Sequence, residues 1–173
     1  INKIDQLKES LTKILDKKQK IYWVCPLIDE SEKLQLQSVN SRVNDLKKYY
    51  SSNSVGLVHG QMSQDEKNEV MSKFKDNKID ILVATSVIEV GIDDPDATVM
   101  IIENSERYGL SQLHQLRGRV GRGNVQSTCI LLFEGPLTDN AKRRLKVMKE
   151  TNDGFLIAEE DLDIRGAGEI LGS

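Results

Sequence analysis

Five short apolar runs alternate with segments of helical periodicity along most of the chain, and this alternation restricts the fold more than any other feature. Each run is four to six residues long and rich in β-branched residues, which favours strands. The runs occupy 21–25, 55–58, 79–84, 98–102 and 128–133. Largely apolar strands with helices between them form a parallel sheet covered on both faces. The sequence therefore predicts an α/β fold.

The segments between the runs show the spacing of amphipathic helices. Two of them carry apolar residues three and four apart, at Ile4, Leu7, Leu11, Ile14 and Leu15, and at Leu36, Val39, Val43, Leu46 and Tyr50. Ser63 stands three residues before Glu66, a capping box that predicts the start of a third helix. Ser111 is expected to cap a further helix over 112–120.

Gly135-Pro136 interrupts this pattern and suggests a boundary. We expect one lobe over 1–136 and a helical appendage over 137–173 that is too small to bury its own core. Ala141, Leu145 and Met148 form the apolar stripe of the first appendage helix. This stripe should pack on the lobe or on a missing partner.

Composition limits the class of protein. The chain contains no run near the roughly 20 apolar residues of a membrane span and begins without the pattern of a signal peptide. Cys25 and Cys129 lie in apolar runs and form no Cys-x-x-Cys pair, so we expect buried, reduced thiols in a cytoplasmic protein. The net charge of −3 leaves only local basic clusters for nucleic acid. These are 117–122 and the set Lys142, Arg143, Arg144, Lys146 and Lys149, which the acidic stretch 159–163 follows.

The most informative segment is 115–122. On a helix, Gln115, Arg119 and Arg122 form one stripe, and a second stripe suited to the core contains Leu113, Leu116 and Val120. Glycines at 118 and 121 disfavour a helix by about 1 kcal/mol each and permit close approach of a ligand. Two guanidinium groups beside them suit a polyphosphate. The alternative is a solvated basic face.

A second segment, 84–93, begins where the run 79–84 ends, in the region where open parallel sheets bind ligands. The Thr85 and Ser86 hydroxyls can donate to phosphate oxygens. Gly91 permits a positive φ, and Asp93 can accept from a ribose hydroxyl or orient an arginine. The alternative is an Asp-Pro turn with ordinary capping hydroxyls.

These two segments resemble motifs VI and V of superfamily 2 helicases and translocases, with Ser86 where the family commonly repeats threonine. The resemblance implies a RecA-like second motor lobe. It makes Arg119 and Arg122 arginine fingers for the γ-phosphate, with Gln115 beside them. It assigns Gly91, Asp93 and Gly118 to the nucleotide, and Thr85 and Ser86 to the DNA backbone.

The stretches 22–28 and 58–62 resemble the motif IV region of the same family and the segment after it. By that resemblance His59 and Gly60 lie near the DNA groove. A loop or core histidine is the alternative for His59.

The tail resembles the translocation motif, which the RecG helicases share with the transcription-repair coupling factors. The matching residues are Arg144-Leu145, Asn152–Phe155, Ala158-Glu159, Asp161-Leu162, Arg165-Gly166 and Gly168-Glu169. In the family this motif is a helical hairpin and a loop, and we expect Arg144 and Arg165 to couple hydrolysis to movement. The stretches 25–32 and 103–110 favour the RecG branch.

The chain has no Gly-Lys dipeptide and therefore no phosphate loop, so alone it should not hydrolyse ATP. Asp29-Glu30 imitates a magnesium-binding box but follows Pro26 without a phosphate cradle, and we interpret it as an acidic loop. No metal-ligand spacing is present.

The resemblance implies a monomeric enzyme acting on forks and Holliday junctions of double-stranded DNA. Its missing first lobe would bind most of the ATP and Mg²⁺, and an N-terminal domain would bind DNA. The alternatives are a coupling-factor translocase lobe and a non-catalytic nucleic-acid-binding module.

Overall fold

Five parallel strands form one sheet in the order β2-β3-β1-β4-β5 in a computed structural model of the chain. The structure describes residues 3–25, 32–85, 97–120, 127–151, 156, 157, 159, 160 and 164. The strands are β1 Lys20–Cys25, β2 Val55–Val58, β3 Ile81–Thr85, β4 Ala97–Ile102 and β5 Thr128–Leu131. The helices are α1 Lys3–Asp16, α2 Glu32–Tyr49, α3 Gln64–Lys75, the 3₁₀ turn η1 Ser105–Arg107, α4 Leu110–Arg117 and α5 Asp139–Glu150. The predicted α/β fold with a parallel sheet is confirmed.

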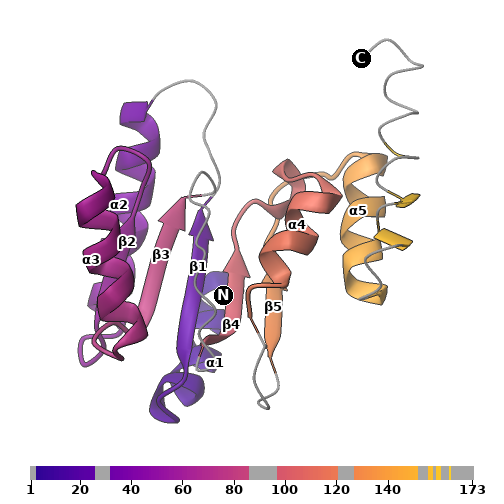
Figure 1. Cartoon of the computed structure of the whole chain (residues 1–173). Helices are drawn as coiled ribbons and strands as arrows, with labels where there is room; N and C mark the ends of the chain where they lie inside the picture. Colours follow the sequence, from indigo (N-terminus) through magenta and orange to yellow (C-terminus); the bar gives the residue numbers. More distant parts are fainter. Residues whose placement is uncertain are drawn as a thin grey trace.

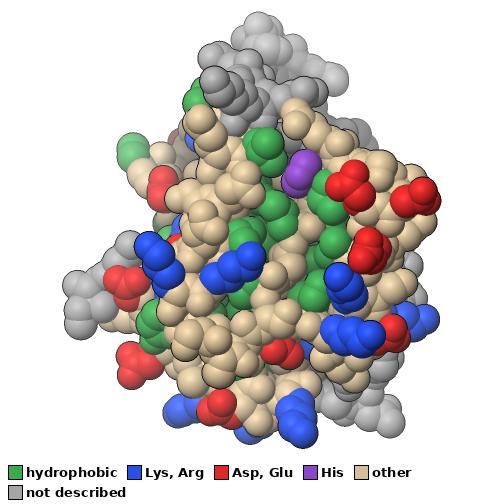
Figure 2. All heavy atoms as spheres, turned by 90° about the vertical axis from the view of Figure 1, so that its left-hand side faces the viewer, with side chains coloured by type: hydrophobic (Ala, Val, Ile, Leu, Met, Phe, Trp, Pro, Cys, Tyr) green, Lys and Arg blue, Asp and Glu red, His purple; other side chains and the backbone are tan. Residues whose placement is uncertain are grey.

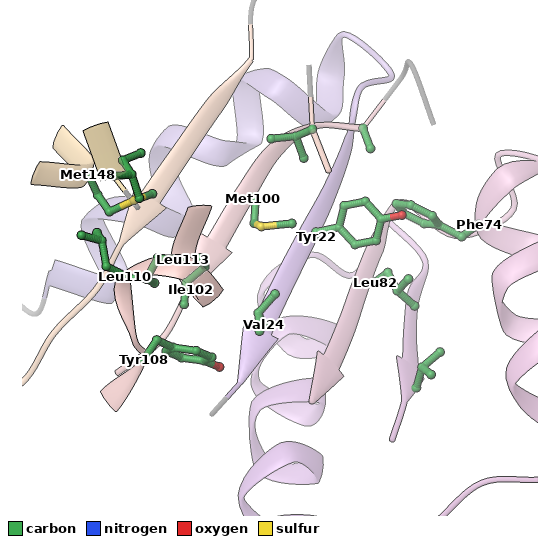
Figure 3. Packing of buried hydrophobic residues seen from close by; sticks show 14 of the residues in the cluster. Tyr22, Val24, Phe74, Leu82, Met100, Ile102, Tyr108, Leu110, Leu113 and Met148 are labelled. Carbon is green, nitrogen blue, oxygen red and sulfur yellow. The ribbon is translucent and has the colours of Figure 1, made fainter. Parts of the chain in front are cut away.

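Helices cover both faces of the sheet, as Figure 1 shows. Along β1, Ile21 and Trp23 pack with residues of α1 and α2, whereas Tyr22 and Val24 pack with residues of α3 and α4. This is the alternation expected of a strand whose side chains point to opposite faces. Figure 3 shows Tyr22 against Phe74 of α3, with ring centroids 4.9 Å apart.

The predicted capping box is present at the start of α3. The Ser63 hydroxyl accepts from the Glu66 amide at 3.1 Å, and Glu66 Oε1 accepts from the Ser63 amide at 3.4 Å. The predicted cap at Ser111 is wrong, because α4 begins at Leu110 after the N-cap Gly109. There the Gln112 side chain accepts from the Gly109 amide at 3.0 Å.

Four of the five strands differ from the predicted runs. β1 and β4 each begin one residue earlier, at Lys20 and Ala97, and β3 ends one residue later, at Thr85. β3 begins at Ile81 rather than Ile79, because the Asp80 carboxylate accepts from the Ser54 amide at 3.1 Å and holds the preceding turn. β5 ends at Leu131 rather than Phe133, which is 45% exposed beyond the end of this edge strand.

The appendage helix α5 packs beside α4 and η1 (Figure 1). Ala141 and Met148 are buried and Leu145 is half-buried, which confirms the predicted docking stripe. Figure 3 shows Met148 close to Leu110 and Leu113 of α4. Across the described ranges, no helix combines the length and apolarity required to cross a bilayer.

Candidate nucleotide and nucleic-acid site

The carboxyl ends of the parallel strands bring the first group of predicted site residues together. β1 and β3 pair Cys25 with Thr85, and β2 and β3 pair Val58 with Ala84. His59 therefore follows β2 next to the end of β3. This edge is where open α/β sheets bind ligands.

Thr85 ends β3 with a side chain that is only 3% exposed. Its hydroxyl oxygen is buried and has no hydrogen-bond partner among the described residues. A buried hydroxyl without a partner is costly. Within the described part of the chain, the Thr85 hydroxyl therefore keeps a donor and an acceptor without a partner at the carboxyl edge of the sheet.

His59 lies in a turn after β2. The Met62 amide closes this turn by donating to the His59 carbonyl at 3.2 Å. Its ring Nδ1 accepts from the Gln61 amide at 3.2 Å. In the neutral ring this bond places the proton on Nε2. His59 is half-buried and Gly60 is exposed, so this turn can present a donor to a ligand outside the lobe.

The motif VI segment differs from the continuous helix that we predicted. α4 ends at Arg117, and the chain continues as a tighter turn in which the Arg119 amide donates to the Leu116 carbonyl at 3.1 Å. The two glycines explain the early end, because glycine disfavours the helix. Gln115 is exposed and Arg119 is half-buried, while Leu113 and Val120 face the core as predicted.

Gly118 has an ordinary helical backbone conformation with φ −67°. A Cβ at this position would meet only the Gln115 and His114 carbonyl oxygens, at 3.5 Å, which is a normal contact. No described residue of the lobe therefore requires glycine at 118.

Arg117 faces away from Gln115 and contacts the appendage. Its Nη1 donates to the Met148 carbonyl at 2.7 Å and to the Thr151 carbonyl at 2.9 Å. Its Nη2 lies 3.1 Å from His114 Nδ1. Burial lowers the pKa of Arg117. The sequence placed Arg117 in a basic cluster and gave no sign of these carbonyl partners.

Arg144 connects the middle of α5 to η1. Its Nη2 donates to the Glu106 carbonyl at 2.9 Å, and the side chain is half-buried. Arg143, its neighbour, instead forms an ion pair with Glu160, with Nε 3.0 Å from Oε2. No pattern in the sequence indicated that Glu160 of the acidic stretch 159–163 pairs with Arg143.

A partly buried ionic cluster, also missed, lies between α1, α2 and the end of β4. Arg42 forms an ion pair with Glu103 at 2.5 Å and another with Asp45 at 3.1 Å. Lys8 is an additional partner of Asp45. Burial raises the pKa of Asp45, but the Lys8 and Arg42 charges outweigh burial and lower it overall. Burial is the main cause that raises the pKa of the Cys25 thiol, and the negative charge of Glu103 raises it further.

Both cysteines are free thiols; Cys25 is buried as predicted, whereas Cys129 is only half-buried. The predicted site residues Ser86, Gly91, Asp93, Arg122 and Arg165 lie outside the described residues, as does the acidic pair Asp29-Glu30. The described residues contain no cluster of three or more His, Cys, Asp or Glu side chains that could hold a metal ion.

Acidic and basic side chains are mixed on the one face of the lobe that Figure 2 draws. Figure 2 shows the face over α2, β2 and α3, where acidic and basic side chains surround a hydrophobic centre. The described residues of that face form no basic patch that would by itself attract DNA.

Comparison with known proteins matches this architecture to a helicase lobe. Residues 2–124 match the family "Helicase conserved C-terminal domain". The chain is 54% identical over 159 residues to the ATP-dependent DNA helicase RecG of Pasteurella multocida (strain Pm70), covering 92% of this chain and 23% of the relative. It is 56% identical over 152 residues to RecG of Escherichia coli (strain K12), covering 88% of this chain and 22% of the relative. The chain thus spans less than a quarter of the length of these relatives.

A solved structure of RecG bound to a three-way DNA junction superposes with a TM-score of 0.80 at 43% identity, covering 96% of this chain and 21% of that one. This agreement confirms the RecA-like lobe that the motif resemblance implied. The chain therefore belongs to the helicase conserved C-terminal domain family, as a RecG-like member of superfamily 2.

Proposed function

We propose that this chain is the second motor lobe of an ATP-dependent translocase that remodels forks and Holliday junctions of double-stranded DNA. One observation carries the proposal. At the end of α4 the lobe places an exposed amide, Gln115, and a half-buried guanidinium, Arg119, on a segment whose other side is fixed in the core. The RecG relatives and the junction-bound RecG structure support the substrate class.

The proposed chemistry is stabilisation of charge across a cleft between two lobes. Arg119 and Arg122 would donate bidentate hydrogen bonds to the terminal phosphate oxygens, where negative charge must be stabilised during transfer. Gln115 would hold the same phosphate region. Gly91, Asp93 and Gly118 would complete the nucleotide contacts of this lobe.

ATP and Mg²⁺ would be held mainly by a first lobe, because this sequence contains no phosphate loop. Mg²⁺ would neutralise phosphate charge when bound there. The residues of this chain would contribute hydrogen-bond donors rather than metal ligands.

DNA would contact the sheet edge through Thr85, Ser86, His59 and Gly60. The His59 Nε2 proton and the Thr85 hydroxyl are donors with the right chemistry for phosphate oxygens. No base-specific set of side chains is needed for such contacts. Binding would therefore follow the backbone and not the sequence of the DNA.

Residues 137–173 would form the translocation element, with Arg144 and Arg165 as coupling residues. The contact of Arg144 with η1, directly before α4, supports this role because it connects α5 to the segment that precedes motif VI. We also propose that the intact enzyme works as a cytoplasmic monomer with an N-terminal DNA-binding domain.

Steady-state kinetics of the full-length enzyme that carries this lobe tests the proposal. We expect ATP hydrolysis that is stimulated by a three-way DNA junction and accompanied by strand separation. Enzyme that binds the junction but shows no DNA-dependent ATP hydrolysis would instead support the non-catalytic alternative. An ATPase that requires RNA polymerase would support the coupling-factor alternative.

A further inference from the structure

Arg117 connects two elements that our proposed function assigns to different tasks. It belongs to α4, whose last turn leads into the motif VI arginines, and it donates to two carbonyls at the end of α5. α5 is the first helix of the proposed translocation element. A single side chain therefore connects α4, which leads into the proposed nucleotide contacts, to α5 of the proposed translocation element.

The Arg117 contacts occupy acceptors that the helix cannot satisfy by itself. The last carbonyls of an α-helix have no intrahelical donor, and Met148 lies in the last turn of α5 while Thr151 is its C-cap. A cation also interacts favourably with the negative end of a helix dipole. Arg117 thus supplies both hydrogen-bond donors and a positive charge at the C-terminal end of α5.

The direction of Arg117 separates it from the nucleotide contacts. Successive helical residues are about 100° apart, so Arg117 and Gln115 point to nearly opposite sides of α4. A shift of α4 driven by the Gln115 and Arg119 side would move the Arg117 side with it. Arg117 is therefore placed to act through α5 without touching the nucleotide.

The surroundings of Arg117 restrict how it can move. Its guanidinium lies near His114, at 3.1 Å, and next to Cys129 of β5 in a partly buried site. A cavity of about 250 Å³ adjoins it between β5 and α5, lined mainly by apolar side chains. The side chains of β5 and α5 therefore leave space between them beside Arg117.

We propose that Arg117 is a positioning residue that transmits movement of the motif VI segment to the C-terminal end of α5, and thereby couples ATP hydrolysis to DNA movement. It acts beside Arg144, which binds α5 to η1 at the middle of the helix. The inference rests on the proposed function, because it requires an ATP-driven lobe.

The test uses Arg117→Met in the full-length enzyme, because methionine keeps part of the aliphatic stem and removes every donor. We expect DNA-dependent kcat and KM for ATP to stay within about 3-fold, since no nucleotide contact is lost. Unwinding of a three-way junction should fall about 10-fold or more, because hydrogen bonds from a charged group are lost. Arg117→Lys should restore part of the unwinding, because one ammonium can reach a carbonyl.

Lys48→Met is the matched control, since Lys48 is exposed on α2, outside both basic clusters, and the charge change is the same. It should leave both rates unchanged. Equal losses of ATPase and unwinding in Arg117→Met, with a lower unfolding temperature and no rescue by lysine, would show a purely structural role and overturn the inference. Unchanged unwinding would overturn it as well.

The proposed function can fail separately. If the wild-type enzyme shows no DNA-dependent ATPase, or if Arg119→Ala retains full turnover, the motor assignment is wrong whatever Arg117 does. If both of those results agree with the motor assignment and Arg117→Met still unwinds normally, only the coupling role of Arg117 is wrong.

Discussion

Arg144 Nη2 donates a hydrogen bond to the Glu106 carbonyl at 2.9 Å, so the middle of α5 is attached to the turn that leads into α4. The Nε of Arg144 and the Oε2 of Glu106 are both buried without a hydrogen-bond partner among the described residues. Among the described residues, one donor of Arg144 and one acceptor of Glu106 therefore remain without a partner next to this contact. An arrangement of this kind can exchange partners when the lobe moves.

The first prediction follows from this contact. In the full-length enzyme, Arg144→Ala should leave DNA-dependent ATPase largely intact, because we propose a coupling role for Arg144 and not a nucleotide contact. Junction unwinding should fall much further, and we expect the same of Arg165→Ala. Both rates are measured on one preparation. Equal losses would indicate misfolding or direct catalysis, and no loss in either rate would mean that Arg144 and Arg165 have no coupling role.

The isolated 173-residue chain should show no ATPase above background, with or without DNA. The reason is that the sequence contains no phosphate loop. The measurement is phosphate release by protein that has been separated from contaminating ATPases. Turnover stimulated by DNA would contradict the two-lobe account directly.

DNA binding by the isolated chain should be weak and sensitive to salt. The chain carries a net charge of −3 and only part of a groove, so a dissociation constant of about 10⁻⁴–10⁻⁶ M is expected, as for non-specific phosphate contacts. A titration of fluorescent duplexes at several salt concentrations measures this. Tight binding that ignores salt or depends on base sequence would be inconsistent with backbone recognition.

The Cys129 thiol provides a test of the packing between β5 and α4. Burial raises its pKa from 9.0 to about 11, against a smaller opposing effect of the Arg117 charge. At pH 8 the thiolate fraction should be lower by about 100-fold, so a Cys25→Ser variant should react that much more slowly with a maleimide when folded than when unfolded. Reaction at the unfolded rate would mean that Cys129 is exposed.

The same shift has a defined consequence for stability. The folded state binds the Cys129 proton more tightly than the unfolded state does. Its contribution to stability is therefore complete below pH 9 and is lost as the pH rises toward 11. Cys129→Ser should weaken this part of the dependence of stability on pH in denaturant titrations.

The sequence predicted the sheet well because each strand is a short apolar run that must be buried. It failed where glycine and backbone groups decide the outcome. After Arg117, where α4 ends, the backbone forms a tighter turn, in which the Arg119 amide donates to the Leu116 carbonyl three residues earlier. The position of this change depends on Gly118 and its neighbours.

The partners of Arg117 and Arg144 are backbone carbonyls. Every residue has such a carbonyl, so no side-chain pattern marks these partners. The acidic stretch raised a similar problem, because several carboxylates compete there and only the folded structure pairs Glu160 with Arg143.

The most direct test of the central claim is the turnover of the full-length enzyme after removal of each motif VI arginine. Arg119→Ala and Arg122→Ala should each lower kcat for DNA-dependent ATP hydrolysis by about 10³ or more, with little change in nucleotide affinity. Arg107→Ala is the control, because Arg107 is exposed on η1 and outside the proposed site. If both variants keep a kcat close to the wild-type value, the segment is a solvated basic face and the motor-lobe account is wrong.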